Sequence, residues 1–386
     1  MTRLHRDRLT WLAYLQVGCY GYFLYGFGPT VPLLRDEQAI SRTLAGLHGT
    51  ALAVGSLASA LVVAPLIRRY GRGPVMWGGL AVLCLGIVAY VGSDALPVTL
   101  SGAMLGAFGG SFVVVPVAAV LSDHHHETGP AAISEANAVA AGIGTVAPLI
   151  VGLAVATDLG WRAALLLLLP VVALLGVVGR RVRFPVPLAA PEQHRGSRRL
   201  PARYWIGWVV VTAGIAVEFC MVLWTADILR ERFGLGDAAA SAGVTTIVAG
   251  MCIGRVFGGR LALRIDVGRL LYLAIAVCGL GFVVFWVTTA PPLALGSLLV
   301  CGLGISLFYP LGIARAIAAS EGRPDLASAR AGLGAALASG GGPFALGALA
   351  DRVGIHGAFL VVPVLLAVAA IGIHASRPPS PAAVRL

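Results

Sequence analysis

Two ionisable residues stand inside long apolar stretches in the second half of the chain, where they could bind and release a proton. Glu218 lies near the middle of the stretch Trp205–Ala226, and Arg255 lies within the stretch Ala242–Leu263. An ionisable side chain at the centre of a membrane helix costs roughly 2.5–3.5 kcal/mol even on lenient insertion scales, so such groups usually mark proton or substrate pathways. We therefore predict that Glu218 and Arg255 couple protons to function, as a buried pair or by alternating between protonated and paired states. The competing interpretation is a structural hydrogen bond from Glu218 to a neighbouring helix.

Other clusters of reactive residue types do not predict catalysis or metal binding. The tract His124–His126 is flanked by Asp123 and Glu127, but no second cluster accompanies it and a solvated loop explains it. The glycines of Gly332–Gly334 lack the preceding strand and the lysine of a nucleotide-binding loop. The sequence contains no GxSxG or HExxH motif, and its six cysteines show no CxxC spacing. We predict no catalytic residue, no metal and no cofactor, and hence that the protein is not an enzyme.

The composition indicates that membrane helices position the two ionisable groups. Of the 386 residues, 58% are hydrophobic and 12% are charged, against about 25% charged in a typical soluble domain; the mean hydropathy is +0.89. A hydrocarbon core about 30 Å thick needs about 20 apolar helical residues. Twelve stretches approach that length, so we predict an all-α polytopic membrane protein with twelve transmembrane helices. These stretches are Leu9–Val31, Ala45–Ile67, Pro74–Val91, Val98–Leu121, Ala132–Ala156, Ala163–Val178, Trp205–Ala226, Ala242–Leu263, Leu270–Val287, Leu293–Ala318, Ala329–Ala350 and Gly357–Ile373.

A polar segment in the middle of the chain predicts its division into two domains. Gly179–Tyr204 contains seven arginines and four prolines, so it is too polar to span a membrane and too rich in proline to form one helix. We expect an N-terminal six-helix bundle over residues 1–178, a cytoplasmic linker over 179–204 and a C-terminal six-helix bundle over 205–386.

The distribution of arginine predicts the orientation in the membrane. The formal net charge is +11 and lysine is absent, but the arginines sit in short gaps between apolar stretches rather than on one soluble face, which excludes a nucleic-acid partner. With both termini in the cytoplasm, twenty arginines fall on the cytoplasmic side and six on the opposite side. The positive-inside rule therefore favours a multi-pass protein of the cytoplasmic membrane with both termini inside.

Glycine and proline positions recur between the two halves at a nearly constant offset. Because each half contains an even number of helices, the two repeats are parallel and related by an axis along the membrane normal, with a cavity between them, as in one large class of transporters. The recurring pairs are Gly46 and Gly243, Gly71-Arg72 and Gly268-Arg269, Pro116 and Pro310, Pro148 and Pro343, and Gly152 and Gly347.

The turn after the second stretch carries a family pattern. Arg69, Gly71 and Arg72 match the pattern G-x-x-x-D-R-x-G-R-R/K, whereas Ala64 and Arg68 stand where the pattern has glycine and aspartate. On this turn, and on the stretches Gly160–Ala164 and Ala348–Gly354, the chain resembles the major facilitator superfamily along essentially its whole length. The resemblance implies a cytoplasmic gating motif at Arg69, Gly71 and Arg72, with Gly268 and Arg269 as its echo. Val217–Phe219 and Ile253–Arg255 are similar to the fucose-permease-like branch.

The resemblance also implies which side chains line the cavity, because the first, fourth, seventh and tenth spans line it in this family. An interfacial aromatic belt competes as the explanation of Tyr25 and Trp224, and snorkelling to the headgroups competes for Arg315, which could otherwise bind an anionic group. We expect Asp227 at the membrane interface. The implied cavity residues are Gln16, Tyr20, Tyr25, Ser111, Trp224, Ser306, Tyr309 and Arg315, beside Glu218.

These features predict a secondary active transporter that moves a small organic solute by alternating access and is coupled to protons. Efflux is favoured because drug and metabolite exporters are frequent in the family that the chain resembles. The alternative is a symporter for uptake of a sugar or an organic acid. Two functions of other classes compete, an integral-membrane enzyme and a solute sensor that does not transport. The expected partners are a small-molecule substrate, protons and membrane lipids, and we expect a monomer.

Overall fold

A computed structural model describes residues 4–157, 159–184, 200–262, 264–321 and 323–375, and within these ranges the regular structure is helical with no strand. This confirms the all-α prediction. The helices are α1 (Arg8–Gln38), α2 (Arg42–Tyr70), α3 (Arg72–Val91), α4 (Leu96–His125), η1 (His126–Thr128), α5 (Gly129–Ala156), α6 (Gly160–Leu166), α7 (Leu168–Gly179), α8 (Ala202–Phe233), α9 (Asp237–Leu261), α10 (Val267–Val287), α11 (Pro291–Ile305), α12 (Phe308–Ala318), α13 (Pro324–Ala358) and α14 (Val361–Ala375).

Every predicted stretch corresponds to helix in the structure. Within the described ranges, ten helical segments are long and apolar enough to cross a membrane, and α14 is a shorter apolar helix. The first stretch forms α1, whose four tyrosines and Gln16 dilute its hydropathy. Three stretches are each divided: α6 from α7 at Leu167, α11 from α12 at Ser306 and Leu307, and the end of α13 from α14 at Phe359 and Leu360. The protein is therefore a polytopic membrane protein.

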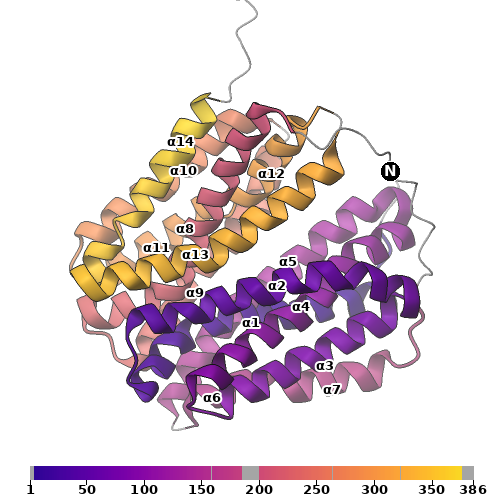
Figure 1. Ribbon diagram of the computed structural model, residues 1–386, viewed down its shortest axis with the longest axis horizontal. Helices are drawn as coiled ribbons and strands as arrows, with labels where there is room; N and C mark the ends of the chain where they lie inside the picture. The colour runs from indigo at the N-terminus through magenta and orange to yellow at the C-terminus, as the bar shows by residue number, and fades with distance from the viewer. Residues whose placement is uncertain (1–3, 158, 185–199, 263, 322, 376–386) are drawn as a thin grey trace, which may run out of the picture.

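The helices α1–α7 form a first half and α8–α14 a second half (Figure 1). The halves meet mainly where α2 packs against α13, α5 against α9, and α1 against α8 and α9. We call the end at which α1 begins and α7 ends the linker end, and the end at which α1 turns into α2 the hairpin end. In Figure 1, α2 and α13 converge at the hairpin end and diverge toward the linker end, where the N-terminus lies. The predicted linker falls between α7 and α8, and its residues 185–199 lie outside the described residues.

Two of the recurring glycines make equivalent contacts in the two halves. A Cβ on Gly152 of α5 would lie 2.6 Å from the carbonyl oxygen of Ala238 at the start of α9. A Cβ on Gly347 of α13 would lie 2.6 Å from the carbonyl oxygen of Arg42 at the start of α2. Since α5 and α13, and α2 and α9, are repeat partners in sequence order, the same backbone approach occurs on both sides of the molecule. Glycine is required at both positions because any side chain would separate the helices.

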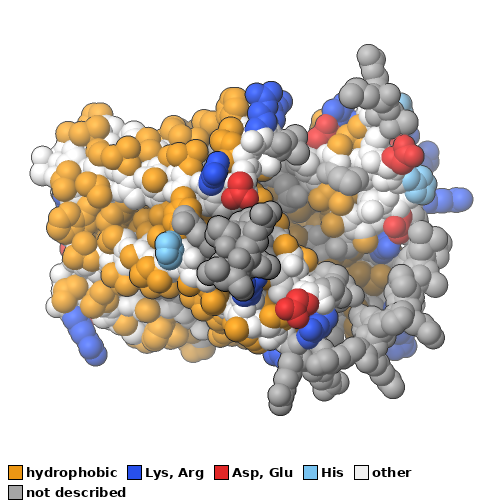
Figure 2. All heavy atoms as spheres, turned by 90° about the horizontal axis from the view of Figure 1, so that it is seen from above, with side chains coloured by type: hydrophobic (Ala, Val, Ile, Leu, Met, Phe, Trp, Pro, Cys, Tyr) orange, Lys and Arg blue, Asp and Glu red, His pale blue; other side chains and the backbone are white. Residues whose placement is uncertain are grey.

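Hydrophobic side chains cover much of the outer surface. Figure 2 shows them over the broad left-hand part of one face, with charged side chains mostly gathered toward the right. Leu61 on α2 is 77% exposed, and Leu174 and Ile371 are also exposed. A soluble monomer rarely exposes apolar patches of this extent, whereas lipid solvates them without cost. The apolar belt is therefore the lipid-facing surface.

Candidate functional site

The structure brings Glu218 and Arg255 together with a tyrosine from the opposite half. Nη2 of Arg255 on α9 lies 3.7 Å from Oε1 of Glu218 on α8. The hydroxyl of Tyr25 on α1 lies 3.4 Å from Oε1 of Glu218 and 3.4 Å from each terminal nitrogen of Arg255. The three side chains form a cluster at the junction of the two halves, which we call the central triad.

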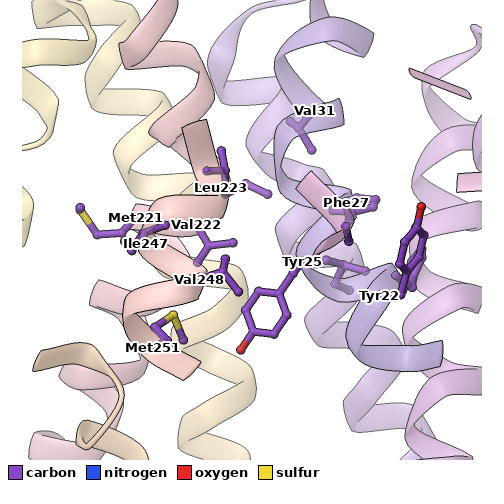
Figure 3. Close-up of a cluster of buried hydrophobic side chains, with 14 of the residues drawn as sticks. Tyr22, Tyr25, Phe27, Val31, Met221, Val222, Leu223, Ile247, Val248 and Met251 are labelled. Carbon is purple, nitrogen blue, oxygen red and sulfur yellow. The ribbon is translucent and has the colours of Figure 1, made fainter. Parts of the chain in front are cut away.

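Close backbone contacts position the members of the central triad. Gly28 lies less than one turn beyond Tyr25 on α1. A Cβ on Gly28 would lie 2.7 Å from the carbonyl oxygen of Val222 on α8, so the two helices approach closely there. Gly254, next to Arg255 on α9, packs so closely against Ser306 that a Cβ would lie 2.2 Å from its hydroxyl oxygen. Figure 3 shows the ring of Tyr25 reaching from α1 toward α8 and α9, beside Val248 and Met251.

The central triad is buried unevenly. Tyr25 is 7% exposed, and the side chain of Glu218 is 13% exposed, whereas that of Arg255 is 33% exposed. Tyr309 of α12 is 44% exposed and lies near enough to Glu218 to interact with it electrostatically. The guanidinium carries five N–H donors, and its 3.7 Å separation from Glu218 is longer than a hydrogen bond. The pair is therefore loose and open to another partner.

A pocket between the halves borders the central triad. Tyr25 and Glu218 line it together with apolar side chains from α1, α2 and α8, namely Leu24, Phe27, Leu52, Phe219, Val222 and Leu223, and with Gly28. The wall is mostly apolar, with Tyr25 and Glu218 as its polar side chains, and Arg255 lies outside the lining, in contact with both.

Three candidates in the first half lie apart from the central triad. Tyr20 of α1 packs on Gly110 of α4, and its hydroxyl interacts with Ser56 of α2 and Ser111 of α4. The Ser111 hydroxyl also donates a hydrogen bond to the Ala107 carbonyl at 2.8 Å. Gln16 is fully buried, and neither atom of its amide has a hydrogen-bond partner among the described residues. Tyr20 and Ser111 thus belong to a polar group within the first half, Gln16 lies one turn before Tyr20 on α1, and the lining of the Glu218 pocket includes none of the three.

The remaining cavity candidates in the second half divide between the site and its support. Trp224 is fully buried and donates a hydrogen bond from Nε1 to the Pro343 carbonyl of α13 at 2.9 Å, which is a packing role. Ser306 is also buried, and its hydroxyl donates to the Leu303 carbonyl at 2.7 Å. Arg315 donates a hydrogen bond from Nη2 to the Ile373 carbonyl of α14 at 3.2 Å, toward the linker end. Of this group, Tyr309 is the residue that interacts electrostatically with Glu218.

The residues of the predicted gating motif lie together at the linker end of the first half. Gly71 has a φ of +85° and ends α2, a conformation that favours glycine. Arg72 pairs with Asp123 at the end of α4, with Nη1 2.6 Å from Oδ2. Arg69 is exposed and its guanidinium lies 5.2 Å from the centre of the Tyr70 ring. This arrangement ties the α2–α3 turn to α4.

The echo of the motif lies at the start of α10. The N–H of Arg269 donates a hydrogen bond to Oδ2 of Asp266, which caps the helix, at 3.1 Å. A Cβ on Gly268 would lie 2.8 Å from Nη1 of Arg315. The glycine therefore makes room for the guanidinium of Arg315 beside the cap.

An ion-pair network closes the hairpin end, and the sequence analysis did not predict it. Asp227 of α8, expected at the membrane interface, is 2% exposed and lies between two arginines of the first half. Its Oδ1 accepts a hydrogen bond from Nη1 of Arg35 at 2.8 Å, and its Oδ2 accepts one from Nε of Arg42 at 2.7 Å. Arg42 also contacts Glu231. We call Arg35, Arg42 and Asp227 the hairpin-end clamp.

Two further carboxylates join the halves beside this clamp. Asp36 of α1 accepts a hydrogen bond from Nη2 of Arg230 on α8 at 2.5 Å. Asp351 of α13 accepts hydrogen bonds from the N–H groups of Arg42 and Thr43 at 2.9 and 2.8 Å. Asp351 thus caps the first turn of α2 from the opposite half, where a carboxylate also complements the helix dipole.

All hydrogen bonds and ion pairs between described residues of the two halves lie at the central triad or on its hairpin side. Besides the clamp and its neighbours, the hydroxyl of Thr50 on α2 donates to the Gly340 carbonyl of α13 at 3.2 Å. The structure is therefore closed by polar contacts at the hairpin end, while the halves diverge beyond the central triad toward the linker end (Figure 1).

The histidine tract makes local contacts. Nε2 of His124 lies 2.8 Å from Oδ2 of Asp7, and Nε2 of His125 lies 2.7 Å from the hydroxyl oxygen of Thr10. In the part of the chain that the structure describes, no group of histidine, cysteine and acidic residues could hold a metal ion. The tract fastens the start of α1 to the end of α4.

Comparisons with known proteins place this architecture in one family. The sequence model of the Major Facilitator Superfamily matches residues 13–324 and again residues 205–385. A search of curated proteins found no match to this sequence.

Similar solved structures include a bacterial homologue of the human lysosomal transporter Spinster, inward-facing and occupied. It has a TM-score of 0.74 at 14% identity, and the match covers 97% of this chain and 94% of that one. The same homologue, inward-facing and unoccupied, has a TM-score of 0.73 at 13% identity and the same coverage. The E. coli fucose:proton symporter has a TM-score of 0.65 at 15% identity, covering 96% and 98%.

Proposed function

Because the chain belongs to the major facilitator superfamily, we propose that it is a proton-coupled secondary active transporter. It carries a small organic solute across the cytoplasmic membrane by alternating access, as a monomer with both termini in the cytoplasm. The membership supports transport, and the arginine distribution supports the orientation. In this orientation the linker end faces the cytoplasm, and the structure corresponds to an inward-facing state.

The proposal of proton coupling rests on one observation, the position of Glu218. Its carboxylate lies in a pocket between the halves, 3.4 Å from Tyr25 of the first half and 3.7 Å from Arg255 of the second. A group at this junction senses both the solute and the relative position of the halves. An intramembrane carboxylate with such partners is suited to binding a proton in one state and releasing it in the other.

The charge interaction is comparable to, but smaller than, the energy that reverses a two-state population. Two unit charges 4 Å apart interact with about 4 kcal/mol at an effective dielectric constant of about 20. Reversal of a two-state population from 1:99 to 99:1 needs about 5.5 kcal/mol. Protonation of Glu218 weakens its attraction to Arg255 and changes its contact with Tyr25 of the other half, and it biases the equilibrium by the difference of these interactions between the inward-facing and outward-facing states.

Alternating access also needs a closed end that can open. The hairpin-end clamp supplies one, because its contacts join the two halves and would have to break for the pocket to open on that side. In the proposed cycle, the clamp forms in the inward-facing state and separates in the outward-facing state. In the outward-facing state, water then replaces Arg35 and Arg42 as the partners of the Asp227 carboxylate.

The direction of transport distinguishes two forms of the proposal. Efflux requires that the proton and the solute exchange in opposite directions, and uptake requires that they move together. The E. coli fucose:proton symporter, by its name, is of the second kind. Efflux is the first expectation from sequence, and proton symport of a sugar or an organic acid is the alternative.

The experiment combines a ligand screen with a flux measurement. Purified protein is screened by thermal shift against sugars, organic acids, organic cations and neutral aromatics, and each ligand is then tested for flux in proteoliposomes with and without a pH gradient. We expect flux that the gradient accelerates. Ligand binding without any flux would identify a solute sensor, and chemical conversion of the ligand would identify an enzyme.

A further inference from the structure

The guanidinium of Arg255, which contacts the pocket residues Tyr25 and Glu218, has unused hydrogen-bonding capacity. Among the described residues its hydrogen-bond partner is the Tyr25 hydroxyl, at 3.4 Å from both terminal nitrogens, and Glu218 lies at 3.7 Å. The guanidinium has five donors, and one third of the side chain is exposed. A planar anion such as a carboxylate can accept two parallel hydrogen bonds from this group. Arg255 can therefore bind a second anion beside Glu218.

The charge of the site decides when that anion binds. With Glu218 ionised, the two side chains neutralise each other and an added anion meets the like charge of the carboxylate. With Glu218 protonated, Arg255 is left without its counter-ion beside a pocket of mostly apolar side chains, where an uncompensated charge is costly. An anionic solute then restores neutrality. Binding of the proton and binding of the anion consequently favour each other.

The groups around the pair do not replace either charge. Tyr25 comes from α1, Tyr309 from α12, and Cys252 from α9 itself, where it interacts with Arg255. Tyrosine and cysteine are largely neutral near pH 7. The side chain that α2 contributes to the pocket is Leu52. Glu218 and Arg255 therefore dominate the charge of the site.

The wall of the pocket selects the body of the solute. The side chains beside Glu218 are Leu24, Phe27, Leu52, Phe219, Val222 and Leu223. Such a wall suits an apolar body, and it offers few partners besides Tyr25 and Glu218 to the many hydroxyl groups of a sugar, whose burial without hydrogen bonds is costly. The pocket therefore favours a small aliphatic or aromatic group.

From these observations we infer that the solute is an amphipathic organic anion, with its acidic group on Arg255 and its apolar body against α1 and α8, and that it binds together with a proton on Glu218. The inference rests on the proposed transport function and specifies its substrate class. It makes the protein a proton–anion symporter, since solute and proton occupy the same state of the site.

A binding experiment with matched probes tests the inference. Full-length protein in nanodiscs is titrated with benzenesulfonate, benzoate and hexanoate, and with benzamide, hexanamide and benzylamine as neutral and cationic partners. We expect benzenesulfonate and benzoate to bind at least about tenfold more tightly than benzamide and benzylamine, and hexanoate at least about tenfold more tightly than hexanamide. A tenfold difference in affinity is the size expected of one charge-assisted hydrogen bond. Benzenesulfonate stays ionised throughout, so its tighter binding at about pH 5.5 than at about pH 8 would report protonation of the protein.

Variants separate the roles of the two charges. Arg255→Gln should weaken binding of the anions by about tenfold or more and leave the neutral probes unchanged, and Arg255→Lys, which keeps the charge without the planar fork, should fall between. Arg260→Gln is the matched control, because Arg260 is an exposed arginine on the same helix. Glu218→Gln should hold the anion affinity at its low-pH value across the whole range.

Proton uptake on binding gives a readout that does not depend on transport. In weakly buffered solution the wild type should take up close to one proton per benzenesulfonate bound near neutral pH, and Glu218→Gln should take up none. Anions that bind no better than their partners, or anion binding without proton uptake, would overturn the inference. Gradient-driven flux of a neutral or cationic solute would overturn the inference and leave the proposed transport function standing. Anion binding with proton uptake but without flux would refute transport and leave the inference about binding intact.

Discussion

The hydroxyl of Tyr25 on α1 lies 3.4 Å from Oε1 of Glu218 on α8, so a side chain of one half contacts the proposed proton site in the other. The same hydroxyl lies 3.4 Å from both terminal nitrogens of Arg255. A change in the charge of Glu218 therefore alters a contact between the two halves directly. This relationship links proton binding to the relative position of the halves.

Replacement of Tyr25 should weaken this link without removing the site. Tyr25→Phe keeps the ring and removes a hydroxyl whose hydrogen bonds contribute about 0.5–1.5 kcal/mol. We expect gradient-driven flux to fall by about twofold to tenfold. Tyr22→Phe is the matched control, because the Tyr22 hydroxyl donates to Ala164 within the first half at 2.7 Å. Equal losses of flux in the two variants would contradict a specific role for Tyr25.

Loss of the buried carboxylate in the clamp should open the hairpin end. Asp227→Asn leaves Arg35 and Arg42 facing a neutral group, and disruption of a buried ion pair costs about 3–5 kcal/mol. The inward-facing state loses this energy, so the equilibrium should shift toward the outward-facing state. Distances between spin labels at the hairpin ends of α2 and α13 would measure the shift.

Glu231 provides the control for this prediction. It also contacts Arg42, but its side chain is 47% exposed, and exposed pairs contribute about 0–1 kcal/mol. Glu231→Gln should leave the label distances close to those of the wild type. If Asp227→Asn behaved like Glu231→Gln, the clamp would not hold the inward-facing state.

The N-terminal cap of α1 should affect stability and not proton coupling. Burial opposes ionisation of Asp7, but hydrogen bonds from Thr10 and His124 outweigh it and lower the pKa of Asp7 from 3.8 to about 2. Since its pKa is lower in the folded protein, the stabilisation by ionised Asp7 is complete above about pH 4 and is lost as the pH falls through about 2.

Asp7→Ala tests this assignment. Loss of an N-cap costs about 0.5–2 kcal/mol, so the variant should melt at a lower temperature than the wild type near pH 7, and the difference should shrink below about pH 3. Its flux should keep the wild-type dependence on pH between about 5.5 and 8. A variant whose flux no longer responded to pH in that range would place a coupling role at Asp7.

Trp224 should prove a packing residue. Its side chain is fully buried and its Nε1 donates to the Pro343 carbonyl at 2.9 Å. Trp224→Phe removes this hydrogen bond, at a cost of about 0.5–1.5 kcal/mol. We expect a lower melting temperature in thermal unfolding and an unchanged ligand affinity at permissive temperature. A large loss of affinity at unchanged stability would return Trp224 to the cavity wall.

Much of the fold was predictable because hydropathy reports directly on contact with lipid. The helical stretches followed from the length that a bilayer requires, and the recurring Gly152 and Gly347 marked equivalent helix contacts. The breaks at Leu167 and Leu307 each lie three residues before a proline, Pro170 or Pro310, which cannot donate a helical hydrogen bond. The sequence therefore carries a signal for both breaks that the prediction of unbroken stretches did not use. The four tyrosines of α1 lowered the hydropathy of a helix that has a largely buried surface.

The site was predictable in part. The cost of burying a charge singled out Glu218 and Arg255, and the structure places them 3.7 Å apart. That Tyr25 reaches both was not predictable, since it depends on how α1 is rotated against α8. The same limit applies to Asp227, because a charge near the end of a helix is equally compatible with the headgroup region and with a pair of arginines from another helix.

The most direct test of proton coupling compares the wild type with Glu218→Gln in proteoliposomes, using the solute found in the thermal-shift screen. Two fluxes are measured for each protein, net flux driven by a pH gradient and exchange of labelled for unlabelled solute at equal pH. We predict that Glu218→Gln abolishes the first and keeps the second, since the variant still alternates but can no longer carry a proton. Wild-type net flux in the variant would show that another group binds the proton and would contradict the account.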